Sequence, residues 1–120
     1  IKKPSELALR YASCDVYISA SSLEACPVPP FEALSCGKPL VLSDIEAHKE
    51  IISLSNSGIV FSLNDTESLY EKIITAYQQK ESLSNSSREF AMNHDWHYTC
   101  KEILHLYDQL TKKTPKDINL

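Results

Sequence analysis

The hydrophobic and polar positions of this chain follow two different periods, and the changes between them mark the expected elements. Short runs of β-branched and apolar residues predict three strands, at residues 15–19, 39–43 and 58–61. Segments in which apolar residues recur about every three to four positions predict helices. The expected helices cover residues 6–12, 31–36, 47–52, 81–93 and 97–110, with a further one that begins after Asp65.

Capping and turn residues support the ends of these helices. Ser5 is expected to cap the first helix, and Asp65 the helix that follows the third strand. Pro29 and Pro30 suit the first turn of the second helix, and Gly37 supplies the left-handed residue that ends it. The expected apolar faces are Leu7, Tyr11 and Cys14 in the first helix, and Leu69, Ile73, Ile74 and Tyr77 in the helix after Asp65.

The alternation of strands and helices predicts an α/β fold, in which helices flank a parallel sheet and the crossovers are right-handed. A doubly wound nucleotide-binding domain typically has about six strands, in two halves that meet where the ligand binds. The pattern here predicts about three strands. We therefore expect half of a doubly wound Rossmann-type sheet, in a single partial domain that spans residues 1–120.

Composition limits the classes of function. The chain has 120 residues, of which 42% are hydrophobic and 23% charged, as in ordinary globular domains. The net charge of -4 gives no electrostatic reason to expect a nucleic acid partner. No apolar run approaches the roughly 20 residues of a membrane span, and residues 1–4 lack the core of a signal peptide. The chain starts without methionine beside a helical pattern, which leads us to expect a piece of a longer protein.

The spacing of cysteines and histidines gives no metal site. The four cysteines form no Cys-x-x-Cys pair, which favours free thiols in a reducing compartment and hence the cytoplasm. His94 and His97 have a spacing that could hold a metal, but the sequence offers no third ligand. We therefore expect no metal. Trp96 is expected to pack at the start of the last helix.

The segment from residue 21 to residue 41 carries the candidate chemistry, because it places two glutamates around a strand-to-helix loop. Glu24 lies in the loop and Glu32 in the following helix, with seven residues between them, and Gly37-Lys38-Pro39-Leu40-Val41 comes after. The loop leaves the carboxyl end of a buried strand, where the N–H groups of the next helix attract anions. Carboxylates accept paired hydrogen bonds from vicinal hydroxyls, so this loop is a candidate site for a nucleoside diphosphate and its sugar.

This segment resembles the family 4 (group 1) retaining glycosyltransferases of the GT-B fold, in which two glutamates with this spacing precede a Glu-Ala-x-x-x-Gly-x-Pro-Val sequence. Residues 11–15, 50–52 and 94–96 also match the usual course of that family. The resemblance implies that Glu32 holds the ribose hydroxyls of the nucleotide and that Glu24 contacts the donor sugar. The donor-binding loop would also include Ala25, Cys26, Pro27 and Val28.

Each glutamate also has a simpler interpretation. Glu32 could be a first-turn glutamate that the helix dipole stabilises by about 0.3–1 kcal/mol, and Glu24 a solvated loop charge. Family members neutralise the leaving diphosphate with an arginine and a lysine that lie upstream of the region covered here. Lys38 does not replace them, because it precedes its strand and so belongs at the opposite edge of the sheet.

The resemblance therefore implies a hexosyltransferase-type enzyme that transfers a glycosyl group, with retention, from a nucleotide-sugar donor to an unidentified acceptor. It also implies no cofactor, because the nucleotide-sugar donor is a substrate. The expected partner is an amino-terminal GT-B domain, and without it we expect these 120 residues to be inactive. If the acceptor is a lipid or a glycan, the protein would bind peripherally at the inner face of a membrane. Two alternatives remain open: a non-catalytic nucleotide-sugar binding module, and a structural domain that only docks its partner.

Overall fold

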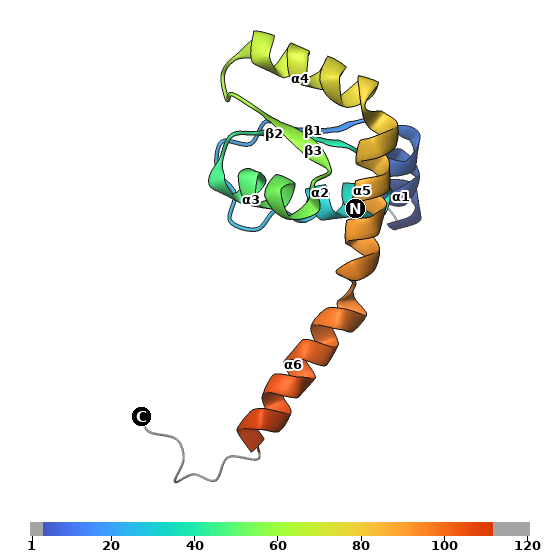
Figure 1. Ribbon diagram of the computed structural model, residues 1–120, viewed down its shortest axis with the longest axis vertical. Helices are drawn as coiled ribbons and strands as arrows, with labels where there is room; N and C mark the ends of the chain where they lie inside the picture. Colours follow the sequence, from blue (N-terminus) through green and yellow to red (C-terminus); the bar gives the residue numbers. More distant parts are fainter. Residues whose placement is uncertain (1–3, 112–120) are drawn as a thin grey trace.

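The computed structural model describes residues 4–111, in which strands and helices alternate up to the third strand (Figure 1). The strands are β1 (Tyr17–Ser19), β2 (Leu40–Ser43) and β3 (Gly58–Phe61). The helices are α1 (Pro4–Ser13), α2 (Val28–Ser35), α3 (Glu46–Ser55), α4 (Thr66–Gln78), α5 (Lys80–Asn93) and α6 (Trp96–Thr111). The expected alternation of strands and helices is confirmed.

The three strands form one parallel sheet in the order β1, β2, β3. Tyr17 of β1 pairs with Leu40 of β2, which pairs with Gly58 of β3. All four residues of β2 are buried, because it is the central strand and helices cover both of its faces. Parallel strands end at the same edge of a sheet, so the loops that follow β1, β2 and β3 lie at one edge.

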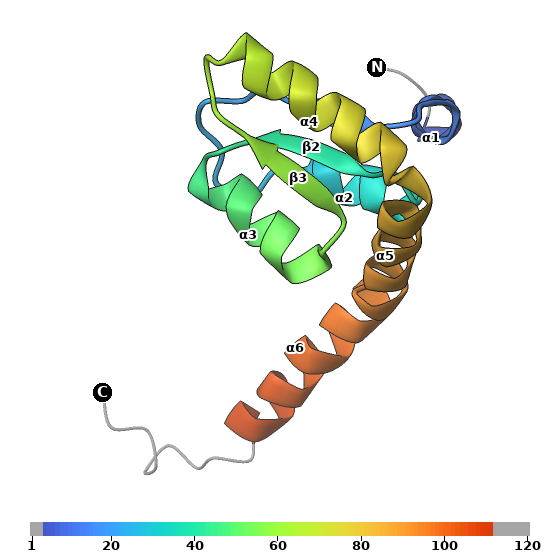
Figure 2. The same cartoon turned by 45° about the horizontal axis from the view of Figure 1, so that its top comes forward.

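Helices pack on both faces of the sheet, which gives the domain three layers (Figure 2). α2 and α3 cover one face, where Leu40 and Leu42 of β2 pack in a cluster with Leu34 and Ile51. α4 covers the other face. The buried residues of the cluster beneath α4 are Val41, Phe61 and Ala76. Successive residues of β2 therefore serve opposite layers, as the pleat of a strand requires.

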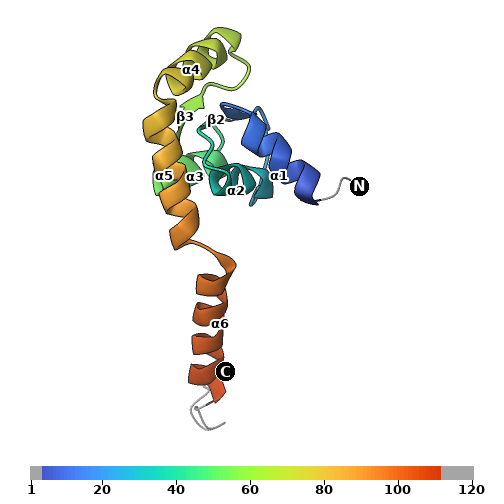
Figure 3. The same cartoon turned by 90° about the vertical axis from the view of Figure 1, so that its right-hand side faces the viewer.

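α5 packs against α2 and ties it to the following turn, and α6 then leaves the body of the domain (Figure 3). Ser87 of α5 is fully buried, and its hydroxyl lies 2.9 Å from both the Lys38 carbonyl and the Leu83 carbonyl of its own helix. Arg88 Nη1 donates to the Ser35 carbonyl, near the end of α2, at 2.7 Å. Because α6 projects from the domain, the principal-axis extents are 60 × 31 × 30 Å.

Element boundaries differ slightly from those expected. β1 and β2 begin later than predicted, at Tyr17 and Leu40, whereas β3 has the predicted range. The expected cap at Ser5 is wrong, because α1 begins at Pro4 and therefore includes Ser5. Proline is favoured in the first turn of a helix, where its missing N–H costs no hydrogen bond. Asp65 caps α4 as expected, and its Oδ1 atom accepts a backbone N–H at 2.9 Å.

The buried face of α4 is only partly the predicted one. Leu69 and Ile73 pack on the sheet as expected, and Ala76 completes the face. Ile74 and Tyr77, which were predicted to share it, are 40% and 51% exposed. Positions three and four apart lie on the same side of a helix, and the row through 69, 73 and 76 is the one turned toward the sheet. The sequence pattern alone does not distinguish this row from the neighbouring row that contains Ile74 and Tyr77.

α6 carries an apolar face that nothing covers in the described part of the chain. Trp96, Ile103, Tyr107 and Leu110 share this face, and each is at least 46% exposed. The prediction that Trp96 packs is therefore wrong for residues 4–111, where this side chain is 81% exposed. The reason is that α6 points away from the domain (Figure 1). No helix within these residues is long and apolar enough to cross a membrane.

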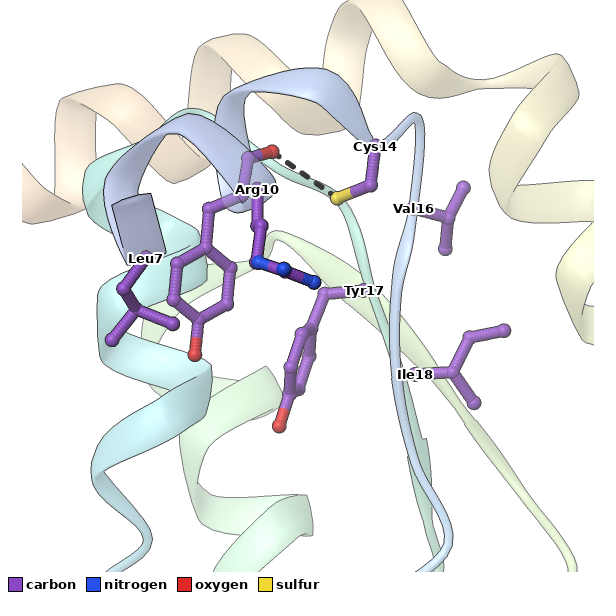
Figure 4. A pocket seen from close by; sticks show the side chains of 7 residues that line it. Leu7, Arg10, Cys14, Val16, Tyr17 and Ile18 are labelled. Atoms are coloured by element: carbon purple, nitrogen blue, oxygen red, sulfur yellow. Dashed lines mark hydrogen bonds between the residues drawn. The ribbon is translucent and has the colours of Figure 1, made fainter. Parts of the chain in front are cut away.

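The outer edge of β1 is unpaired in the described part of the chain, and a shallow hollow of about 320 Å³ lies beside it (Figure 4). The residues that line this hollow are Leu7, Arg10, Tyr11, Cys14, Val16, Tyr17 and Ile18. Cys14 Sγ donates to the Tyr11 carbonyl at 3.2 Å, and Ile18 is 42% exposed. An unpaired strand edge of this kind can pair with a further strand.

Candidate functional site

The loop between β1 and α2 leaves the carboxyl edge of the sheet and carries Glu24. Glu32 lies in the second turn of α2, which begins at Val28. The interpretation of Glu32 as a first-turn glutamate is therefore wrong, and the effect of the helix dipole has largely fallen off at this position. Burial raises the pKa of the Tyr17 phenol, and the charges of Glu24 and Glu32 raise it further. A hydrogen bond with Ser19 lowers this pKa in part, and Tyr17, the first residue of β1, is half-buried.

Tyr11 of α1 holds the Glu32 carboxylate in place. Its hydroxyl donates to Glu32 Oε2 at 2.9 Å, across 21 positions of the sequence. Burial raises the pKa of Tyr11, and the bond to Glu32 raises it further, so the phenol remains a donor. An ionised carboxylate has about four acceptor positions. One bond from Tyr11 therefore orients the half-buried Glu32 and leaves acceptor positions for the hydroxyls of a ligand.

Glu24 is exposed, and its Oε1 atom accepts a hydrogen bond from the Ser21 hydroxyl at 2.8 Å. The side chain lines a groove of about 590 Å³ between its loop and α3. Lys49, which also lines the groove, forms an ion pair with Glu46 at 2.8 Å. Within residues 4–111 no ion pair involves Glu24. A neutral hydroxyl thus orients this carboxylate without neutralising it.

The amino end of α2 offers fewer hydrogen-bond donors than expected. The N-cap and the first three residues of a helix carry the N–H groups that have no partner within the helix. In α2 these positions are Pro27, Val28, Pro29 and Pro30, and the prolines have no N–H. The expectation of several N–H groups for an anion is therefore wrong, because only Val28 supplies one. A diphosphate bound here would need positive charge from elsewhere.

The other residues of the expected loop divide between two hollows. Ala25 lines the groove beside α3, whereas Cys26 and Val28 line a hollow of about 650 Å³ that also contains Glu32. This second hollow lies between α2, the end of α5 and the start of α6. Pro27 is buried, so it shapes the loop more than it contacts a ligand. The four cysteines of the chain are all free thiols.

Two further predictions concern residues outside this loop. Lys38 lies just before β2, at the amino edge of the sheet, and its Nζ atom donates to the Ala12 carbonyl at 2.9 Å. His94 stacks on Phe90, with 4.1 Å between the ring centroids. In the part of the chain that the structure describes, no three His, Cys, Asp or Glu side chains are grouped to hold a metal ion. That the protein needs no metal stays a prediction.

Sequence reasoning missed the hydroxyls that bond to the two glutamates, and a buried polar pair beside the loop. It placed Tyr11 on an apolar face, although a tyrosine there also brings a hydroxyl. It did not single out Ser43 and His48, which are both fully buried. The available signal was a serine at the end of a buried strand, followed five positions later by a histidine. Ser21, within the loop, was missed because a serine is ordinary in any loop.

Comparison with known proteins places the chain in a family. Residues 2–93 match the sequence profile of the family described as glycosyl transferases group 1. The chain is similar to an N,N'-diacetylbacillosaminyl-diphospho-undecaprenol alpha-1,3-N-acetylgalactosaminyltransferase of Campylobacter jejuni, with 29% identity over 90% of this chain and 30% of that protein. It is also similar to a GDP-mannose-dependent alpha-mannosyltransferase of Mycobacterium tuberculosis, with 24% identity over 86% of this chain and 28% of that protein. The chain thus spans 30% or less of the length of these two relatives.

Two solved structures have a similar fold. Sucrose-phosphate synthase from Thermosynechococcus elongatus matches with a TM-score of 0.78 and 22% identity, over 88% of this chain and 28% of that chain. WaaG, a glycosyltransferase involved in lipopolysaccharide biosynthesis, matches with a TM-score of 0.68 and 20% identity, over 79% of this chain and 27% of that chain. The predicted α/β fold, with three parallel strands flanked by helices, is confirmed.

Proposed function

Because the chain belongs to the glycosyl transferases group 1, we propose that it is the donor-binding part of a longer glycosyltransferase, termed here the parent protein. The parent transfers a hexosyl group from a nucleotide-activated donor to an acceptor, with retention of the anomeric configuration. The donor is a substrate, and the transfer uses no separate cofactor. Residues 24–32 form the part of the donor site that this chain supplies.

The observation that carries this proposal is the pair of oriented glutamates, Glu24 in the loop after β1 and Glu32 in the second turn of α2. Each carboxylate accepts a hydrogen bond from a neutral hydroxyl, Tyr11 for Glu32 and Ser21 for Glu24. These bonds orient the carboxylates and leave their negative charge intact, which suits them to accept bonds from vicinal sugar hydroxyls. We assign the ribose to the half-buried Glu32 and the donor sugar to the exposed Glu24.

The diphosphate of the donor requires groups that stabilise its negative charge. Negative charge develops on it as the glycosyl bond breaks, and stabilising that charge is usually the largest contribution to such catalysis. The start of α2 contributes its dipole and the N–H of Val28, but no side-chain cation. We therefore propose that the basic residues for the diphosphate, the acceptor site and any catalytic base belong to other parts of the parent, and that the chain is inactive alone.

An amino-terminal domain of the parent is the proposed partner of the exposed apolar surfaces. A helix with one continuous apolar face normally packs that face against other elements. In α6 the face of Trp96, Ile103, Tyr107 and Leu110 is exposed in the described chain. The outer edge of β1 has a different proposed neighbour, a strand from the other half of the doubly wound sheet of this same domain.

The nature of the acceptor is proposed by analogy with relatives. One relative is named for a diphospho-undecaprenol substrate, and WaaG is described as acting in lipopolysaccharide biosynthesis. We propose a lipid-linked or glycan acceptor for the parent protein. A cytoplasmic enzyme with such an acceptor would bind peripherally at the inner face of a membrane.

A transfer assay with the parent protein tests the proposal. Incubated with UDP- and GDP-activated hexoses and with lipid-linked or free glycan acceptors, it should release nucleoside diphosphate and form a glycoside. Proton NMR of the product should show the anomeric configuration of the donor. A parent that binds a donor and transfers to no acceptor would support a binding module instead. A parent that binds no nucleotide would leave only the docking role.

The 120-residue chain by itself is expected to self-associate through the unpaired edge of β1. Replacing Ile18 with lysine places a charge on that edge and should shift the chain toward monomer in sedimentation velocity. Leu54→Lys is the matched control, since Leu54 is an exposed leucine on α3, away from β1. A chain that is strictly monomeric, or that associates equally with and without Ile18→Lys, would contradict this expectation.

A further inference from the structure

A buried polar pair lies directly beneath the loop that carries Glu24, and the proposed donor contacts do not use it. Ser43, the last residue of β2, and His48, in the first turn of α3, are each 0% exposed. Their side chains meet at 2.9 Å between Ser43 Oγ and His48 Nδ1. Burying a hydroxyl and an imidazole is costly unless their hydrogen bonds are made, so the arrangement of these bonds is informative.

The hydrogens of this pair can be assigned from its partners. Ser43 Oγ donates to the Ser21 carbonyl, which can only accept. A hydroxyl has a single hydrogen, so His48 Nδ1 must be the donor in its contact with Ser43 Oγ. His48 Nδ1 also lies 3.2 Å from the Ser43 carbonyl, which again requires an N–H at Nδ1. The order of donation is therefore from His48 to Ser43, and from Ser43 to Ser21.

Ser21 connects this pair to the candidate site. Its carbonyl receives the bond from Ser43, and its own hydroxyl donates to Glu24 Oε1 at 2.8 Å. The carbonyl fixes the backbone of Ser21, and the backbone sets the position from which the hydroxyl reaches Glu24. The loop is otherwise exposed at residues 22–26, so few other contacts hold it.

We propose that Ser43 and His48 are positioning residues that hold Glu24 in its donor-binding orientation through Ser21. The inference rests on the proposed function, because it takes Glu24 as the contact to the donor sugar. Neither residue touches the donor. Their effect is to hold the loop after β1 against the ends of β2 and α3, so that the carboxylate is already in place when the donor binds.

The main test compares Ser43→Ala in the parent protein with the same change in a Glu24→Gln background. Ser43→Ala alone should lower kcat for transfer roughly tenfold or more, since misplacing a reacting group by about 1 Å can cost on the order of a hundredfold. The Kd for bare UDP or GDP should stay within about twofold, because the ribose contact is assigned to Glu32. In the Glu24→Gln background, Ser43→Ala should lower kcat by less than about twofold, because both changes act through one contact.

Ser87→Ala is the matched control for the removal of a buried hydroxyl. Ser87 is also 0% exposed, and its hydroxyl lies 2.9 Å from two carbonyls, that of Leu83 in its own helix and that of Lys38 in the turn before β2, at the amino edge of the sheet. It should leave kcat within about twofold. If Ser43→Ala does not fold, Ser43→Cys keeps a similar side-chain shape with a weaker donor, and it should also lower kcat, by less than loss of the donor would.

Two substitutions at His48 add a readout that a purely structural role would not produce. The amide nitrogen of asparagine can take the place of Nδ1, whereas that of glutamine reaches the place of Nε2. His48→Asn should therefore retain more of kcat than His48→Gln, although it is the smaller side chain. Thermal unfolding of both variants shows whether the difference in kcat merely follows a difference in their stability.

The outcomes separate this inference from the proposed function. If Glu24→Gln lowers transfer and Ser43→Ala does not, the positioning role is overturned and the donor site stands. It would also be overturned if Ser43→Ala lowered kcat equally in the unchanged parent and in the Glu24→Gln variant. The same holds if Ser43→Ala weakened the binding of bare UDP or GDP as much as it lowers kcat. If Glu24→Gln leaves transfer unchanged, the role proposed for Glu24 fails, and the positioning role fails with it.

Discussion

A Glu32→Gln variant of the parent protein is expected to bind bare UDP or GDP roughly ten- to a hundredfold more weakly than the unchanged protein. Glutamine keeps the shape of the side chain but replaces a charged acceptor with a neutral amide. The charge-assisted bonds to the ribose hydroxyls should therefore weaken by about 1.5–3 kcal/mol. Isothermal titration calorimetry with the nucleoside diphosphate measures this loss with no sugar attached.

Two other variants serve as comparisons for Glu32→Gln. Glu24→Gln should leave the affinity for the bare nucleotide nearly unchanged while transfer falls, because its proposed partner is the sugar. Tyr11→Phe removes the hydroxyl that orients Glu32 and should weaken nucleotide binding less than Glu32→Gln, by roughly two- to tenfold. Equal losses of bare-nucleotide affinity in the two glutamate variants would contradict the division of roles.

Gly58→Ala is expected to destabilise the domain by about 3 kcal/mol or more, which makes it the most damaging single-methyl change we identify. Gly58 starts β3, where a Cβ atom would overlap the Leu40 carbonyl of β2. It would also lie 2.7 Å from Leu40 Cβ and 2.8 Å from Ile52 Cδ1. The backbone of the central strand cannot move away, because it is paired on both sides. Thermal and urea unfolding of the 120-residue chain measure the change.

Gly37→Ala is the control that separates crowding from backbone strain. Gly37 has a φ of 66°, so alanine there costs about 1–2 kcal/mol of left-handed strain. The nearest atom to its Cβ is the Ser84 carbonyl oxygen at 3.8 Å, an ordinary contact. Gly58→Ala should therefore be clearly the more destabilising change. Equal stability of the two variants would show that β2 and β3 can separate at little cost.

Local patterns predicted the elements best where the cause of each element is local. β3 begins at a glycine that follows a polar pair, and its predicted range of 58–61 is the observed one. β1 is shorter than predicted. Pairing with a neighbouring strand decides where a strand begins, and the pairing of β1 with β2 starts only at Tyr17. The position of the sheet also decides which side of α4 is buried, and this is the side that carries Leu69, Ile73 and Ala76.

The candidate site was found from the sequence in part. The two glutamates, and their place after a strand and on the next helix, were predicted by spacing and by resemblance. The supply of N–H groups at the start of α2 was overestimated, because it depends on where the helix begins. With Val28 as the first residue, prolines occupy three of the four positions that would otherwise carry an unpaired N–H.

The sequence by itself determined the fold class, the family and the two carboxylates, because these depend on local periodicity and on a short motif. Only the tertiary structure decided what supports those carboxylates. Tyr11 reaches Glu32 across 21 positions, and Ser43 reaches the carbonyl of Ser21 across 22. Such contacts depend on how α1, α3 and the ends of β1 and β2 come together. A hydrogen bond depends on distances of a few tenths of an ångström between segments far apart in the chain, and no local pattern of residues specifies those distances.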